Sequence, residues 1–295
     1  MDSKDREGNI IPAEEGAQEK LVKILYGTAM GRKALKLLVQ PVVSKAGSRF
    51  LDSGLSRFCI SPFIEKSNIV MEEYEEEEYE SFNQFFARRI KEGRRTFAEE
   101  PSLLCAPCDS RLSVYKINKD GTFYIKNTVY TMDTLVRSKR LAKEYLGGTL
   151  CVFRLTVSDY HHYCYVDDGE KTKNYKIPGV YHTVAPLAGE AYPVYTENTR
   201  EFSILKSKNF GNVLMMEVGA MLVGRIVNHH QKLSVHRGME KGFFEFGGST
   251  VILAFPKGAV VMDKDITENT KDGFETLVKM GEVIGRKVKY EDNDS

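Results

Sequence analysis

After Pro101 the chain consists mainly of short segments rich in Val, Ile, Tyr, Phe and Thr, separated by Gly and Pro. Such residues favour strands, whereas Gly and Pro favour the turns between strands. A helix from Thr131 to Tyr145, ended by Gly147 and Gly148, is expected to interrupt this pattern. We therefore predict a predominantly β domain, either barrel-like or a sandwich, with strands near residues 149–157, 163–166, 213–218, 250–255 and 259–262.

The residues before Pro101 have a helical pattern instead. Apolar residues between Ala17 and about Gln40 recur at helical spacing, and breaks are expected at Gly27, Gly31 and Pro41. Ser81–Arg95 also has apolar residues at helical spacing, which predicts a helix packed on a core: Phe82, Phe85, Phe86 and Ile90. The whole chain is thus predicted to be α+β, with a helical region over 1–100 and a β-rich catalytic domain over 101–295.

The charge is balanced overall but not locally. With 42 basic and 41 acidic residues, the chain has a net charge of +1, which gives no general electrostatic argument for a nucleic acid partner. Between Lys20 and Arg57, however, eight basic residues accompany the single acid Asp52, a local charge of +7. Such a segment can lie on an anionic membrane or form a packed subdomain with a solvated basic face, and both interpretations stay open. The acidic run from Glu72 to Glu80 is interpreted as the solvated entry to a helix.

The sequence lacks an apolar run of membrane-spanning length or a secretory signal, so we expect a soluble or peripheral protein, in the cytoplasm. Five dispersed cysteines favour reduced thiols over a disulfide framework. Cys105 and Cys108 have the spacing of a redox pair or half a zinc site, which His161 and Cys164 could complete. Structural thiols are the favoured interpretation, because a second Cys-x-x-Cys is missing.

Gly247-Gly248-Ser249-Thr250 stands directly before the apolar run Val251-Ile252-Leu253. Two glycines before a strand are explained by a turn alone. A serine hydroxyl beside an uncrowded Gly-Ser peptide can also attack the preceding carbonyl and convert the amide into an ester. Elimination and hydrolysis would then leave a pyruvoyl group at position 249, a ketone that can accept the electrons released in a decarboxylation.

Two other segments supply titratable groups. Alternation along a strand places His161 and His162 on opposite faces, so at most one of them points at a given site. Asp109 follows a Pro-led turn and could orient a histidine that deprotonates Ser249. Each residue also has a structural explanation, as a turn cap or a hydrogen-bonded strand histidine, and His229 and His230 are interpreted as solvated or structural.

Taken together, these segments resemble the phosphatidylserine decarboxylase family in order and spacing. Six motifs over nearly all of the chain after residue 80 carry the resemblance: Ser81 to Phe86, Ala106 to Asp109, Asp159 to His161, Ile177 to Gly179, Val218 to Ala220 with Val223-Gly224, and Phe246 to Thr250. The N-terminal helices match this family only in character.

The resemblance implies that the chain cuts itself between Gly248 and Ser249, that Ser249 becomes the pyruvoyl cofactor, and that Asp109 and His161 assist. The two resulting chains would stay associated, and the enzyme would convert phosphatidylserine into phosphatidylethanolamine and CO2 without a metal. His161 would act first as the base in cleavage and later as a proton donor. Many family members have a second histidine where this chain has Cys164, which leaves the base assignment between His161, His162 and Cys164 open. We further expect a peripheral protein on the cytoplasmic side of an anionic membrane, with a homo-oligomer possible and no nucleic acid partner.

Three other functions are compatible with the residues. A non-catalytic β module tethered to membranes would never react at Ser249. A serine hydrolase would use Asp109, His161 and Ser249 without self-cleavage, but the chain lacks the Gly-x-Ser-x-Gly elbow that commonly presents such a nucleophile. A pyruvoyl-dependent decarboxylase of a soluble amino acid would need no lipid, and the cationic N-terminal region favours the lipid substrate over it.

Overall fold

The computed structural model describes residues 2–12, 17–125, 128–185, 188, 192–220 and 225–288. At its centre, strand β16 (Ser249–Phe255) lies antiparallel between β12 (Gly211–Val218) and β7 (Thr149–Leu155), and β7 pairs in turn with β4 (Ser110–Lys116). All residues of β16 are buried. Because both faces of this strand are covered, its sequence is a nearly unbroken apolar run instead of an alternating pattern.

Further strands extend the central sheet on both sides. The strands beyond β12 are β11 (Arg200–Ser207), β9 (Gly169–Lys171), β14 (Leu233–Val235) and β10 (Tyr175–Ile177), which also pairs with β11. The strands beyond β4 are β18 (Glu275–Val278), β1 (Ser3–Lys4) and β2 (Ile10–Ile11). The first residues of the chain therefore complete the β-sheet, which the prediction of a helical region over 1–100 did not foresee.

A second sheet covers one face of the first. It consists of β13 (Ile226–Asn228), β15 (Glu240–Phe244) and β8 (His162–Cys164). Lys241 Nζ of this sheet lies 2.8 Å from Glu217 Oε2 of β12, and Asn228 Nδ2 donates to the same carboxylate. The described strands form two packed layers without closing into a barrel, so the predicted α+β class with a sandwich-like domain is confirmed.

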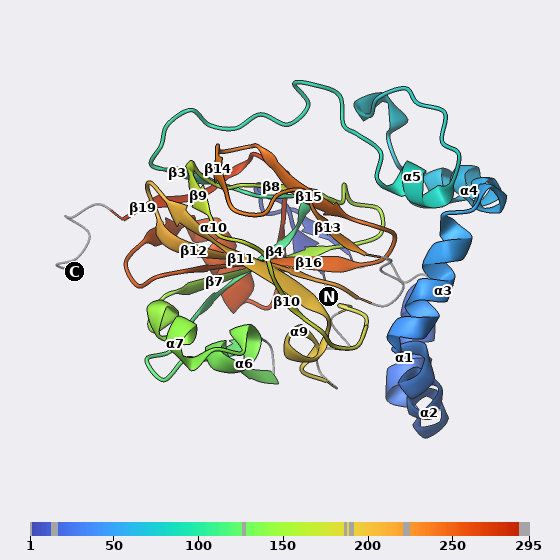
Figure 1. Ribbon diagram of the computed structural model, residues 1–295, viewed down its shortest axis with the longest axis horizontal. Coiled ribbons are helices and arrows are strands. Elements are labelled where there is room, and N and C mark those ends of the chain that lie inside the picture. The colour runs from blue at the N-terminus through green and yellow to red at the C-terminus, as the bar shows by residue number, and fades with distance from the viewer. Residues whose placement is uncertain are drawn as a thin grey trace.

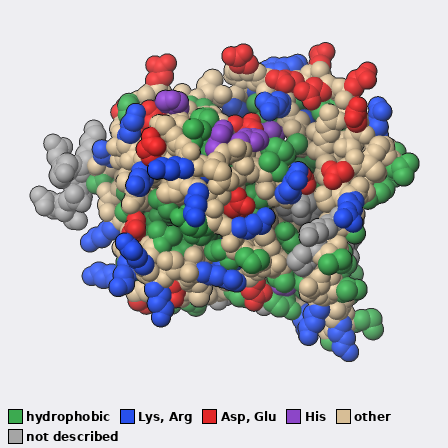
Figure 2. Space-filling view, in the orientation of Figure 1, with side chains coloured by type: hydrophobic (Ala, Val, Ile, Leu, Met, Phe, Trp, Pro, Cys, Tyr) green, Lys and Arg blue, Asp and Glu red, His purple; other side chains and the backbone are tan. Residues whose placement is uncertain are grey.

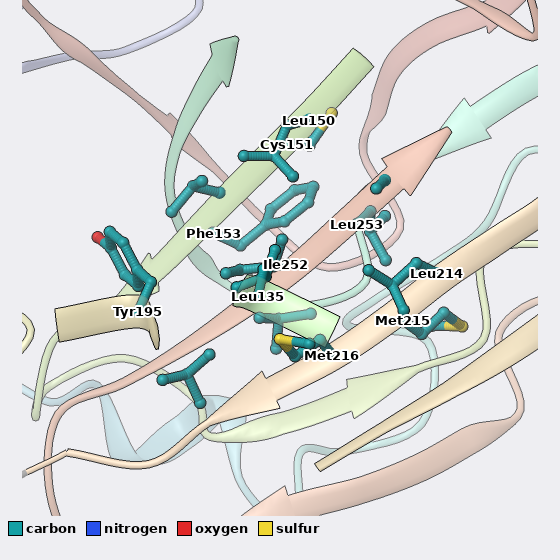
Figure 3. Packing of buried hydrophobic residues seen from close by; sticks show 14 of the residues in the cluster. Leu135, Leu150, Cys151, Phe153, Tyr195, Leu214, Met215, Met216, Ile252 and Leu253 are labelled. Atoms are coloured by element: carbon teal, nitrogen blue, oxygen red, sulfur yellow. The ribbon is translucent and has the colours of Figure 1, made fainter. Parts of the chain in front are cut away.

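Short helices cover the opposite face of the large sheet. They are α6 (Met132–Val136), α7 (Lys139–Ala142), η3 (Lys143–Tyr145) and α9 (Val194–Glu197). The buried Arg200 guanidinium of β11 donates to the carbonyl of Leu135, which places α6 against the sheet. Figure 3 shows Leu135 and Tyr195 from these helices beside apolar side chains of β7, β12 and β16. The single helix predicted over 131–145 is wrong, because Arg137 adopts a left-handed conformation with φ of 49° and ends α6.

Other strands and one more helix lie outside these two sheets. They are β17 (Val260–Met262), β19 (Val283–Lys287) and β3 (Leu103–Cys105) in one small sheet, the hairpin of β5 (Thr122–Ile125) and β6 (Thr128–Thr131), and helix α10 (Lys264–Lys271). The predicted strands 149–157, 163–166, 213–218, 250–255 and 259–262 differ from β7, β8, β12, β16 and β17 by no more than two residues at either end.

The N-terminal helices form an arm along the side of the sandwich (Figure 1). We call the following helices the arm: α1 (Ala17–Gly27), α2 (Ala29–Leu38), α3 (Pro41–Leu51), η1 (Gly54–Cys59) and α4 (Ile60–Lys66). Two short helices, η2 (Met71–Glu73) and α5 (Phe82–Phe86), follow the arm along the chain. The predicted break at Gly31 is wrong. Gly31 lies inside α2, where a Cβ atom would come within 2.1 Å of the carbonyl oxygen of Ile24, so glycine permits the close packing of α2 on α1. Pro41 begins α3, as suits a residue without an N–H group.

Candidate active site

Three segments that the sequence singled out meet at one end of the central sheet. Ser249 begins β16 and pairs with Leu155, the last residue of β7, so the loop that carries His161 leaves from the same end. Asp109 directly precedes β4, whose first residues pair with the end of β7. Because neighbouring strands lie about 4.8 Å apart, β4 is roughly 10 Å from β16. Gly219 and Ala220 also leave β12 at this end, whereas Val223-Gly224 lies outside the described residues.

Ser249 is completely buried in the uncut chain. Among the described residues its Oγ atom has no hydrogen-bond partner. A buried hydroxyl group without a partner costs about 1–3 kcal/mol, so natural structures rarely keep one without a reason. This hydroxyl is therefore a candidate for a reacting group.

His161 is buried beside the same loop. Its Nδ1 atom lies 2.8 Å from the main-chain oxygen of Asp159, which can only accept, so Nδ1 carries the proton and Nε2 has a free lone pair. Nε2 has no partner of normal hydrogen-bond geometry within the described residues, although the ring faces the backbone of Gly247. Burial lowers the pKa of His161 to about 3, and the ring is therefore neutral near pH 7. A neutral imidazole with a free lone pair is suited to act as a base.

His162 points to the other side of β8, as alternation predicted. Its ring stacks on Tyr160 and on Phe243, with centroid distances of 4.7 and 5.1 Å. The ring of His161 instead contacts Phe86 at 4.3 Å. Of the two histidines, the structure thus orients His161 toward the loop that precedes Ser249.

Asp109 is held by partners other than His161. Its carboxylate accepts two hydrogen bonds from the Arg95 guanidinium and one from the Met280 N–H group, at 2.5–2.9 Å. It forms no hydrogen bond with either ring nitrogen of His161, whose Nδ1 is satisfied by the Asp159 carbonyl. The role of Asp109 in assisting self-cleavage stays a prediction. In the uncut chain its carboxylate is hydrogen-bonded to Arg95.

The two glycines before Ser249 differ in what they permit. Gly247 has φ of +138°, in the region that favours glycine. Gly248 has an ordinary φ, and a Cβ atom there would meet Val184 at 3.5 Å and the carbonyl oxygen of Leu155 at 3.7 Å, which are normal contacts. Gly247 therefore shapes the turn, whereas at Gly248 neither the backbone conformation nor a close contact requires a glycine.

Helix α5 and the arm both contact the turn that precedes Ser249. The ring of Phe246 packs against Phe82 at 5.0 Å and Phe86 at 5.1 Å, and its N–H group donates to Asn83 Oδ1. Ser48 of α3 donates to Glu245. The sequence predicted only that these phenylalanines pack on a core, because periodicity cannot show that the core includes the turn before Ser249.

Asp159 and Arg95 are further residues whose roles the sequence reasoning missed. Asp159 Oδ2 accepts hydrogen bonds from the N–H and hydroxyl groups of Thr156 and forms an ion pair with Arg111 at 2.9 Å, which fixes the loop that presents His161. Asp159 stood in a recognised motif, so a signal was available, whereas the pairing of Arg95 with Asp109 depends on tertiary contacts alone.

The cysteines are free thiols, and Cys105, Cys108 and Cys164 are buried. Cys164 Sγ donates to the carbonyl of Pro107 at 3.2 Å, and burial raises the pKa of this thiol, so it is protonated near pH 7. Across the described residues, no group of three or more His, Cys, Asp and Glu side chains is placed to hold a metal ion. A cavity of about 610 Å³ between α6–α7 and β10–β11 lies on the face of the sheet that the short helices cover, away from Ser249.

Known proteins that are similar to this chain share one family description. The family model described as phosphatidylserine decarboxylase matches residues 82–286. A phosphatidylserine decarboxylase proenzyme 2 of Clostridium acetobutylicum is 48% identical over 90% of this chain and 91% of its own length. Proenzymes with the same enzyme name from Ruminiclostridium cellulolyticum and Clostridium novyi are 42% and 38% identical, over 92% and 96% of this chain and 93% and 98% of their own lengths. With its motifs, its buried Ser249 and this level of identity, the chain belongs to the phosphatidylserine decarboxylase family.

Proposed function

We propose that this protein is a proenzyme that cuts itself between Gly248 and Ser249 and then decarboxylates phosphatidylserine to phosphatidylethanolamine. The observation that carries the proposal is the burial of two unpartnered groups at one end of the sheet, the Ser249 hydroxyl and the Nε2 lone pair of His161. Family membership and the word proenzyme in the names of the relatives support it.

The residues present can perform the cleavage. His161 Nε2 takes the hydroxyl proton as Ser249 Oγ attacks the Gly248 carbonyl carbon, and the proton then goes to the departing nitrogen. The chain is now held by an ester. Loss of the Ser249 α-proton breaks the ester C–O bond, leaving a Gly248 carboxylate and dehydroalanine at position 249. Addition of water and loss of ammonia then yield the pyruvoyl group.

The position of Ser249 fits the cofactor that it would become. The pyruvoyl ketone supplies the electron sink that decarboxylation requires, and it would lie at the start of a strand fixed by β7 and β12. His161 is our candidate for returning a proton to the product. Because burial disfavours its protonated form, the uncut site suits the base role better than the donor role.

The two chains would remain associated after cleavage. Residues 249–295 contain β16, which is hydrogen-bonded on both sides, and also β18, which pairs with β4 and β1 of the other chain. Separating the two chains would break these strand pairings within the central sheet. The turn over residues 245–248 would gain a free end, which supplies a route by which the closed site could open to substrate.

The arm supports a lipid substrate over a soluble amino acid. It exposes large apolar side chains that are 46–82% accessible: Ile24, Met30, Leu37, Val42, Phe50, Leu55 and Phe58. Exposed basic residues accompany them, and Figure 2 shows both kinds of side chain on the arm at the lower right. No helix in the described parts of the chain has the length and apolar character to cross a bilayer. Apolar and basic groups together are typical of a peripheral interface with anionic lipid, here the cytoplasmic face that the sequence led us to expect.

Ser249→Ala tests the proposal. Without the hydroxyl group the chain should remain a single species on denaturing electrophoresis, whereas the natural chain should yield residues 1–248 and 249–295. The mass of the shorter natural fragment should show a pyruvoyl group in place of the first serine. Recovery of two fragments from Ser249→Ala, or an intact serine in an active natural enzyme, would contradict the proposed mechanism.

A further inference from the structure

His162 occupies an unusual position between the arm and the second sheet. Its ring is almost completely buried, with the side chain 3% exposed. Nε2 lies 3.0 Å from the main-chain oxygen of Ala87, the residue that ends α5. Nδ1 lies 3.1 Å from Glu240 Oε2 of β15.

Both ring nitrogens of His162 face oxygen atoms of neighbouring elements. A main-chain carbonyl and an ionised carboxylate can only accept hydrogen bonds. Burial disfavours the charged carboxylate, but hydrogen bonds from His162 and His229 lower the pKa of Glu240 to about 2, so it is ionised near pH 7. The His162 ring therefore lies between two acceptors, the Ala87 carbonyl on α5 and the Glu240 carboxylate on β15.

The carbonyl that His162 binds belongs to the residue next to Phe86. Phe86 is buried, and its ring lies 4.3 Å from His161 and 5.1 Å from Phe246. One aromatic side chain therefore contacts both the candidate base and the turn that precedes the scissile peptide. The other end of α5 is held by the arm, since Ser56 accepts from the Phe82 N–H group and Asp52 accepts from Asn83 Nδ2.

We propose that His162 is a positioning residue for self-cleavage, which acts by holding the end of α5 so that Phe86 fixes His161 against the turn before Ser249. The inference rests on the proposed self-cleavage at Ser249. It assigns a role to the histidine that has no contact with the reacting atoms. It also gives the arm a role in the chemistry, because α5 connects the arm to the base.

The contact geometry provides a matched set of variants. In His162→Gln the amide Nε2 can take the place of the ring Nε2 and still donate to Ala87. In His162→Asn the side chain is too short to reach Ala87, although it can still donate toward Glu240. His229→Asn is the control, because His229 Nε2 lies 2.5 Å from the other oxygen of Glu240 and does not contact α5.

The full-length chain would be made by cell-free synthesis with a short pulse of labelled methionine, and its conversion into two fragments followed by denaturing electrophoresis. We expect His162→Asn to slow cleavage by about tenfold or more, because displacements of about 1 Å in a reacting set can cost up to 100-fold. His162→Gln and His229→Asn should stay within about twofold of the natural chain. A His162→Asn chain that cleaves at the natural rate, or a His162→Gln chain that is as slow as His162→Asn, would overturn the inference.

Unfolding must be separated from positioning. The same substitutions in the uncut Ser249→Ala background allow the midpoint of thermal unfolding to be compared, and positioning requires slow cleavage at an unchanged midpoint. If His162→Asn does not fold, Phe86→Leu and Phe82→Leu decide the matter, since both rings touch Phe246 but Phe86 is the one in contact with His161. Only Phe86→Leu should slow cleavage, and equal rates would overturn the inference. A natural chain that never cleaves would instead refute the proposed function.

Discussion

The arm and the end of the central sheet at which Ser249 lies differ in which side chains they expose and bury, and both differ from the usual pattern. Between Ile24 and Phe58 the arm exposes large apolar side chains, whereas the sheet buries the Ser249 hydroxyl and His161 Nε2 without partners. A buried ion pair between the two sheets provides the contrast, because Lys241 Nζ lies 2.8 Å from Glu217 Oε2. Exposed apolar area and unsatisfied buried polar groups are both unfavourable, and both are informative for that reason.

The difference shows how two parts of one function can be separated in a chain. The exposed apolar side chains of the arm suit a surface that a lipid interface would cover. The buried hydroxyl and imidazole groups at the end of the sheet suit a site that excludes water until it reacts. The two regions meet at Phe246, where the aromatic side chains of α5 pack on the turn before Ser249. Substitutions of exposed side chains on the arm, away from α5, should therefore change its surface while leaving the site of cleavage intact.

The largest effect is expected at the base. His161→Asn should slow self-cleavage by at least about 100-fold, because general base catalysis contributes about 10²–10⁴-fold. His236→Asn is the control, since its side chain is 78% exposed. The measurement is the half-time of conversion to two fragments after cell-free synthesis. Cleavage of His161→Asn at the natural rate would assign the base to another group, such as Cys164.

A smaller effect is expected on the arm. The triple variant Met30→Ser, Leu37→Ser and Phe58→Ser should bind vesicles that contain anionic lipid at least about tenfold more weakly, because partial burial of three such side chains contributes more than about 1.4 kcal/mol. Cleavage of the precursor should be unchanged. Flotation with the vesicles measures the binding.

The matched control for the arm removes exposed apolar side chains from the sandwich: Tyr124→Ser, Val129→Ser and Val261→Ser, where the natural residues are 55%, 52% and 37% exposed. These changes should leave vesicle binding as it is. An equal loss in both triple variants would show that the arm is not a dedicated membrane surface.

The smallest effect is expected from pH. Because burial lowers the pKa of His161 to about 3, the base stays neutral as the pH falls, and its capacity to accept a proton is retained. Cleavage should therefore slow by less than about twofold between about pH 7.5 and 5.5, whereas a histidine of ordinary pKa would slow it about tenfold. The measurement is the rate of cleavage in buffers across this pH range. A tenfold decline would mean that the base has an ordinary histidine pKa and is solvated.

Much of the site could be predicted from local patterns. Gly-Gly-Ser before an apolar strand indicated the proposed cleavage position, and period-two alternation correctly separated His161 from His162. The breaks in helices were predicted less well, because Gly31 serves close packing between two helices and Arg137 ends α6 in a conformation uncommon for a residue with a side chain. Such positions depend on neighbours that a local pattern does not contain.

Residue order alone was enough to predict the α+β class, a strand over 250–255 directly after Ser249, and the family, because periodicity and motif spacing are properties of neighbouring residues. The tertiary structure decided which segments and side chains meet. Strands β1 and β2 join the sheet, Arg95 donates hydrogen bonds to Asp109, and Phe86 contacts both His161 and Phe246. These contacts join residues far apart along the chain. They exist only after the hydrophobic effect has packed the layers together, so they follow from the fold as a whole.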